Sequence, residues 1–76
     1  MTGREWIDQF AAQLGLAPPD DATFEALLSL AGTAAHASER LAAPIACYLV
    51  GLAGLDVSVA QALANGVAQG GGGEQG

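Results

Sequence analysis

Pro44 interrupts the longest apolar part of this 76-residue chain and strongly limits how the chain can fold. Inside a helix, its ring would clash with the carbonyl group of Arg40, and it has no N–H to donate. Proline is tolerated in the first turn of a helix, where N–H groups have no partner within the helix. The sequence therefore predicts a helix that begins between residues 41 and 43 and ends at residue 52, after a polar connection over residues 37–40. A single helix kinked at the proline is the alternative.

The start of the chain predicts another amphipathic helix, over residues 5–14. Its apolar residues recur at the spacing of one helix face: Trp6, Ile7, Phe10 and Leu14. Thr2 and Glu5 are three residues apart, the spacing of a capping box in which each side chain bonds to the other residue's backbone. Gly15 is suited to end the helix because glycine adopts a left-handed conformation at little cost.

Capping residues predict two more helices. A Pro-Pro connector at positions 18–19 cannot be helical, and Asp20 or Asp21 after it caps a helix over residues 22–36. Gly54 ends the helix that follows Pro44, and Asp56 caps a last helix over residues 57–69. No strand pattern is present. The sequence predicts an all-α fold, a compact bundle of about four short helices in one domain over residues 1–69, with a flexible Gly-rich tail over residues 70–76.

Large apolar side chains are scarce, and we expect most of them inside the bundle. The helix after Pro44 is expected to direct Ile45, Leu49 and Leu52 inward, with Tyr48 close by. Trp6 and Tyr48 could line a ligand pocket, but large core side chains are the simpler interpretation. A chain this short is expected to be marginally stable or to gain stability by self-association.

The charge balance excludes several classes of partner. The chain has 2 basic and 8 acidic residues, a formal net charge of −6. It cannot supply the basic contacts that dominate nucleic-acid binding, and it is not suited to anionic membrane surfaces. A single cysteine cannot form an intramolecular disulfide or a cysteine-based metal site, so we predict no metal and no cofactor. The first residues contain no hydrophobic signal region, so a cytoplasmic location is expected.

His36, Ser38 and Arg40 are the candidate binding residues. They come just before the helix that contains Pro44, and free N–H groups at the start of a helix attract anions. These residues could therefore bind a phosphate or carboxylate group. In the structural alternative, Arg40 pairs with an acid (Asp8, Glu39 or Asp20) and His36 bonds to a backbone carbonyl.

No catalytic residue is predicted. His36 and Cys47 could in principle act as a base and a nucleophile, but such a pair needs a third group to orient the base. Cys47 follows an apolar run and is interpreted as a small core residue.

Several segments together resemble a small helical family of unknown function from actinobacteria. They are Glu5-Trp6-Ile7, residues 26–31, Tyr48-Leu49-Val50-Gly51 and the pattern A-H-x(3)-R-x(3)-P over residues 35–44. Members of that family occur alone or joined to the molybdenum-cofactor guanylyltransferase, molybdopterin-guanine dinucleotide biosynthesis protein A. The resemblance implies an accessory role in molybdenum-cofactor maturation and not guanylyl transfer, because the transferase's Gly-rich nucleotide-binding motif is absent.

Two hypotheses of different classes follow. The first is a non-enzymatic accessory module that binds a protein partner (the guanylyltransferase or a molybdoenzyme) or a phosphorylated ligand. The second is a structural homo-oligomer, in which a second copy completes the apolar helix faces.

Overall fold

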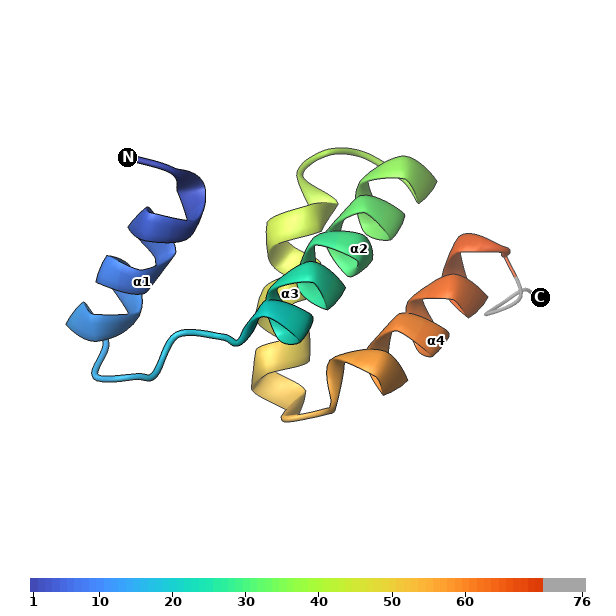
Figure 1. Cartoon of the computed structure of the whole chain (residues 1–76). Coiled ribbons are helices and arrows are strands. Elements are labelled where there is room, and N and C mark those ends of the chain that lie inside the picture. The colour runs from blue at the N-terminus through green and yellow to red at the C-terminus, as the bar shows by residue number, and fades with distance from the viewer. Residues whose placement is uncertain (71–76) are drawn as a thin grey trace.

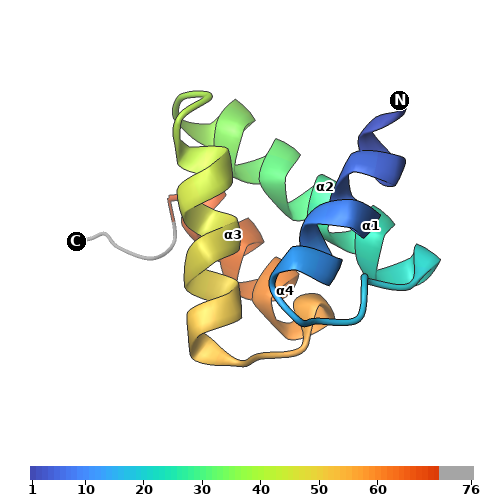
Figure 2. The same ribbon diagram turned by 90° about the vertical axis from the view of Figure 1, so that its left-hand side faces the viewer.

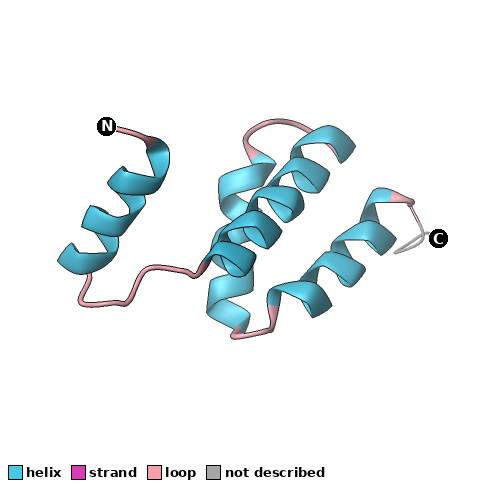
Figure 3. Cartoon of the chain, viewed as in Figure 1, coloured by secondary structure: helices cyan, strands magenta, loops and turns pink. Residues whose placement is uncertain are grey.

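Four helices make up most of the structure, a computed structural model that describes residues 1–70. They are α1 (Gly3–Gln13), α2 (Asp21–Ala37), α3 (Ala42–Ala53) and α4 (Val57–Ala68), and residues 1–70 contain no strand (Figures 1 and 3). The all-α fold of about four short helices is confirmed. Apart from Gly70, the tail expected at residues 70–76 lies outside the described residues.

The predicted capping residues begin three of the helices. At α1, the Thr2 Oγ1 atom accepts the Glu5 N–H at 3.0 Å and the Glu5 carboxylate accepts the Thr2 N–H at 2.7 Å. The Asp20 carboxylate accepts the Thr23 N–H at 2.7 Å, and that bond holds the pKa of Asp20 below its usual value. Asp56 caps α4 in the same way, at 2.8 Å from the Ser58 N–H. These bonds satisfy N–H groups that have no partner within the helix.

The break before Pro44 is confirmed, and the single kinked helix is excluded. α2 ends at Ala37, and α3 begins at Ala42, which places Pro44 in its first turn. α3 ends at Ala53 and is capped by Gly54, whose φ of 69° is in the left-handed region that glycine adopts without strain.

The central helix is α2, which packs against α3 and α4 (Figure 1). α1 makes no comparable helix contact and lies across α2 and α3 from α4, as Figures 1 and 2 show. Arg4 links it to α2 by an ion pair with Asp21 at 2.9 Å, and the Arg4 guanidinium lies 4.1 Å from the centre of the Phe24 ring. The molecule is elongated as a result, with extents of 43 × 23 × 18 Å.

Very little of the chain is buried. Among the described residues, the buried apolar set consists of Ala11, Leu30 and Ala60, and Leu30 is the only large side chain that is fully buried. The prediction of which face of α3 packs inward was wrong, because the half-buried residues of this helix are small ones such as Ala46 and Val50. Small residues allow helices to approach closely, and the bulkier ones are then left outside.

The predicted large core residues are accordingly at the surface. Trp6 is 53% exposed and Tyr48 is 64% exposed, so neither is a core side chain. The other predicted inward residues of α3 are also more than half exposed: Ile45, Leu49 and Leu52.

A polar network links α2 to α4. The Gln61 Nε2 atom donates to Thr33 Oγ1 at 3.0 Å and to Asn65 Oδ1 at 2.8 Å, and the Thr33 hydroxyl donates to the Ser29 carbonyl at 3.2 Å. The Gln61 Oε1 atom is buried and has no hydrogen-bond partner within residues 1–70. A buried acceptor without a partner costs about 1–3 kcal/mol, which offsets what the other bonds contribute.

We therefore expect Gln61→Leu to leave the free energy of unfolding unchanged or to raise it by about 1 kcal/mol. Leucine removes the unpartnered oxygen and keeps the apolar stem, while Thr33 keeps its bond to Ser29. Urea unfolding followed by circular dichroism measures the change, with Gln61→Ala as the control that removes amide and stem together. A larger loss with leucine than with alanine would contradict the expectation.

Candidate functional site

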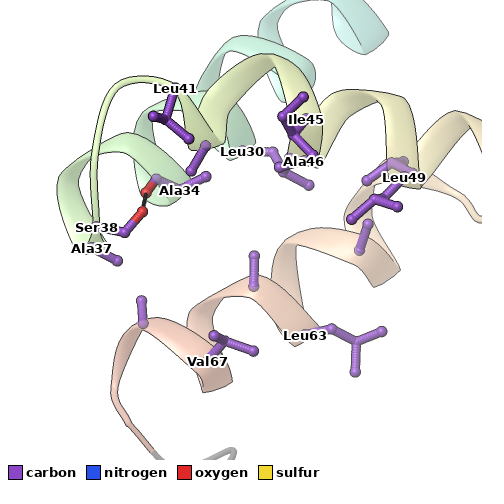
Figure 4. A pocket seen from close by; sticks show the side chains of 15 residues that line it. Leu30, Ala34, Ala37, Ser38, Leu41, Ile45, Ala46, Leu49, Leu63 and Val67 are labelled. Carbon is purple, nitrogen blue, oxygen red and sulfur yellow. Dashed lines mark hydrogen bonds between the residues drawn. The ribbon is translucent and has the colours of Figure 1, made fainter.

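An open apolar groove lies between α2, α3 and α4 (Figure 4). Its volume is about 590 Å³, and 15 residues line it, none of them with an ionisable side chain. The larger side chains come from all three helices: Leu30, Leu41, Ile45, Leu49, Leu63 and Val67. Small residues such as Ala34, Ala60 and Ala64 form much of the rest and leave the space open.

The large side chains around the groove face solvent. Apart from the fully buried Leu30, the other five residues named above are all more than half exposed. The single polar side chain in the lining, Ser38, donates its hydroxyl to the Ala34 carbonyl at 2.8 Å (Figure 4). A contiguous exposed apolar surface of this kind is typical of a binding site for another apolar surface.

The three predicted binding residues lie where α2 ends and α3 begins, at one end of the groove. His36, Ser38 and Arg40 are all exposed, and only Ser38 lines the groove. They are neighbours in the chain, and no hydrogen bond or ion pair joins their side chains within residues 1–70. Ligand binding by these residues stays a prediction.

One premise of the anion hypothesis is wrong. The first two N–H groups of α3 are not free, because Ala42 donates to the Glu39 carbonyl at 3.0 Å and Ala43 donates to the Arg40 carbonyl at 3.1 Å. Pro44 follows and has no N–H. The backbone at this end of α3 therefore lacks the free donors that favour an anion at other helix starts.

The structural alternative for Arg40 and His36 is not supported either. Within residues 1–70 the only ion pair joins Arg4 to Asp21, so Arg40 pairs with none of the three acids proposed for it. Over the same residues, the His36 ring makes no hydrogen bond. Both residues are exposed where α2 ends and α3 begins.

The other candidate residues do not form a reactive centre. Cys47 is half-buried on α3, and burial raises the pKa of its thiol, which lowers the fraction of reactive thiolate at neutral pH. In the part of the chain that the structure describes, no cluster of three His, Cys, Asp or Glu side chains could hold a metal ion. None of the helices there combines the length and the apolar character needed to cross a membrane.

The groove is not among the features predicted from the sequence. One signal points toward it: the apolar stripe of α4 includes Leu63 and Val67, which line the groove. Its other walls come from α2 and α3, so it depends on the packing of three helices and not on any local motif.

A second exposed apolar surface lies on the outer face of α1. Trp6 and Phe10 stack with their ring centroids 5.0 Å apart and their planes at 33°. Together with Gln9 and Gln13 they line a shallow hollow without any charged side chain. We call these four residues the aromatic face of α1.

Comparison with known proteins identifies the family but no characterised relative. The chain matches no curated protein and no solved structure. A family model described as a domain of unknown function, DUF6457, matches residues 1–72, nearly the whole chain. This protein therefore belongs to the DUF6457 family.

Proposed function

We propose that this domain is a non-enzymatic accessory module that binds a protein partner through the groove between α2, α3 and α4. The observation that carries the proposal is the groove itself, about 590 Å³ of open space with an uncharged lining. Such a surface has no group that could transfer a proton or attack a substrate. It suits the apolar face of a partner's amphipathic helix, one of the common modes of peptide recognition.

The polar residues at the end of the groove fit a role at the rim of such an interface. Arg40 and His36 are exposed next to the apolar lining, where charged side chains affect orientation and association rate more than affinity. Arg40 is one of two basic residues in an acidic chain. An acidic group on the partner would be its natural contact.

The resemblance noted for this chain supports a partner in molybdenum-cofactor biosynthesis. We propose the molybdenum-cofactor guanylyltransferase, or a molybdoenzyme that receives the cofactor. The domain would act by holding the partner and not by chemistry of its own.

NMR spectroscopy of the ¹⁵N-labelled domain tests this proposal. Titration with the purified guanylyltransferase is expected to broaden or shift the amide signals of the groove residues on α3 and α4. Parallel titrations with GMP and inorganic phosphate are expected to leave the spectrum unchanged. Shifts concentrated on residues 36–46 with phosphate would instead support an anion site, and a spectrum insensitive to every addition would contradict the proposal.

A second candidate function, assembly with copies of itself, is favoured by the small buried set. Only three of the described residues are buried and apolar, and fifteen large apolar side chains are exposed. Domains of this size often need oligomerisation to bury enough apolar surface.

A further inference from the structure

The chain exposes two surfaces that carry large apolar side chains and no charged side chain. One is the groove between three helices, and the other is the aromatic face of α1, where Trp6 and Phe10 are exposed beside Gln9 and Gln13. We propose that the aromatic face of α1 from a second copy of this chain occupies the groove, and that two copies exchange α1 reciprocally. The inference rests on the proposed function in taking the groove as a docking surface, and it names the occupant of that surface when no other partner is present.

The aromatic face has the spacing of a helix that docks in a groove. Trp6 and Phe10 are four residues apart and already stacked, so they form a single anchor. They are 53% and 46% exposed, and Leu14, four residues further on, is 56% exposed. Tryptophan and other aromatic side chains dominate the energetics of protein interfaces when they enter an apolar pocket.

Repulsion between two negatively charged copies does not oppose the contact between the groove and the aromatic face. The net charge of −6 makes two copies repel each other at a distance, but salt at physiological concentration screens that repulsion beyond about 8 Å. Neither the groove lining nor the aromatic face contains a charged side chain. The amides of Gln9 and Gln13 flank the aromatic rings and can remain hydrated at the rim.

The chain exposes more surface than a compact monomer of its mass. The chain exposes 5314 Å², whereas compact folded monomers of its mass of 7.5 kDa expose about 4,200 Å². The excess is of the same order as the roughly 800 Å² that each partner buries in a standard interface. A reciprocal exchange forms the α1–groove contact twice, so each copy contributes both surfaces.

α1 is weakly attached and well placed to exchange. Its contacts with α2 include the ion pair of Arg4 with the exposed Asp21 and the stacking of Arg4 on Phe24, and ion pairs at the surface contribute little. Ala11 is the only buried residue of this helix. The linker to α2 contains Pro18 and Pro19, which favour extended backbone. α1 lies across α2 and α3 from α4 (Figures 1 and 2).

Trp6 is the only tryptophan of the chain and reports directly on the contact. In a concentration series, the wild-type chain is expected to change from the mass of one chain to that of two in analytical ultracentrifugation. The tryptophan emission should shift to shorter wavelength over the same range. A one-chain mass up to hundreds of micromolar would overturn the inference, and so would a blue-shifted emission at every concentration with that mass, which would mean that α1 fills its own groove.

Two complementary variants locate the contact. Trp6→Ala/Phe10→Ala removes the aromatic face and leaves the groove, whereas Leu49→Glu places a charge in the groove and leaves α1. Each alone is expected to weaken the dimer at least tenfold, and Leu52→Glu, on α3 but outside the groove lining, is the matched control.

Mixing the two variants should restore one of the two contacts. The emission of Trp6, which only the Leu49→Glu chain then contains, should shift to shorter wavelength as its α1 enters the intact groove of the double variant. This recovery also shows that both variants are folded, and Trp6→Ala alone serves if the double variant is not. A dimer that persists in the α1 variant would overturn the inference. Loss of guanylyltransferase binding in Leu49→Glu, with a monomeric wild type, would refute α1 exchange while supporting the proposed function.

Discussion

Replacing Leu30 by alanine is expected to lower the free energy of unfolding by about 3 kcal/mol, within the range of about 2–5 kcal/mol for buried leucines. Leu30 is 1% exposed and is the only large side chain that is fully buried. It lies on the central helix, α2, and lines the base of the groove. A domain of this length has only about 4–10 kcal/mol of stability in total, so the variant should be substantially unfolded at moderate urea concentration.

Leu28→Ala is the matched control for this prediction. It makes the same substitution on the same helix, two residues away, at a side chain that is 56% exposed. The expected loss is below about 1 kcal/mol, because little apolar burial is removed and alanine favours the helix slightly more than leucine. Urea unfolding followed by circular dichroism measures both variants. Equal losses would show that stability does not depend on the single buried leucine.

The helix boundaries could be predicted because they depend on local chemistry. Thr2, Asp20 and Asp56 cap N–H groups two or three residues away in the chain, so no tertiary contact is needed to place them. Pro44 acts locally as well, through its missing N–H and its ring. These signals placed every helix boundary within about two residues of the structure.

The buried faces could not be predicted, because they depend on how the helices pack. Apolar periodicity on α3 is broad, since nearly every residue of AAPIACYLVGLA is apolar. Which part of that surface is covered is decided by the close approach of small residues to α2. The large side chains Tyr48 and Leu52 therefore remain outside, although their size predicted the opposite.

The candidate site, like the fold, could be predicted from the sequence only in part. The sequence placed His36, Ser38 and Arg40 correctly before α3, but the hydrogen bonds of the turn decide whether the helix has free N–H groups. The groove has no sequence signature of its own, since its walls come from three helices. Its uncharged character could be anticipated only from the low share of charged residues, 13%.

If the domain binds the guanylyltransferase as we propose, Leu49→Glu is expected to weaken that binding at least tenfold, which corresponds to about 1.4 kcal/mol. Leu49 lines the groove, and docking of an apolar partner surface would bury the new carboxylate without a counter-charge. The fold should tolerate the change, because the side chain is already 55% exposed. Fluorescence anisotropy with the labelled domain measures the affinity, and thermal unfolding confirms that the variant is folded.

Leu52→Glu tests whether the loss of affinity depends on the groove itself or on the apolar character of α3 in general. It introduces the same charge on the same helix at a leucine that is 69% exposed and does not line the groove, so its affinity should match that of the wild type. Equal weakening by the two variants would mean that net charge or another surface controls binding, and the groove would lose its role. If a second copy occupies the groove, binding of the partner by the wild type should also weaken at domain concentrations at which the domain is dimeric, because α1 and the partner's helix compete for one surface. Trp6→Ala/Phe10→Ala should remove that competition and leave the groove open to the partner.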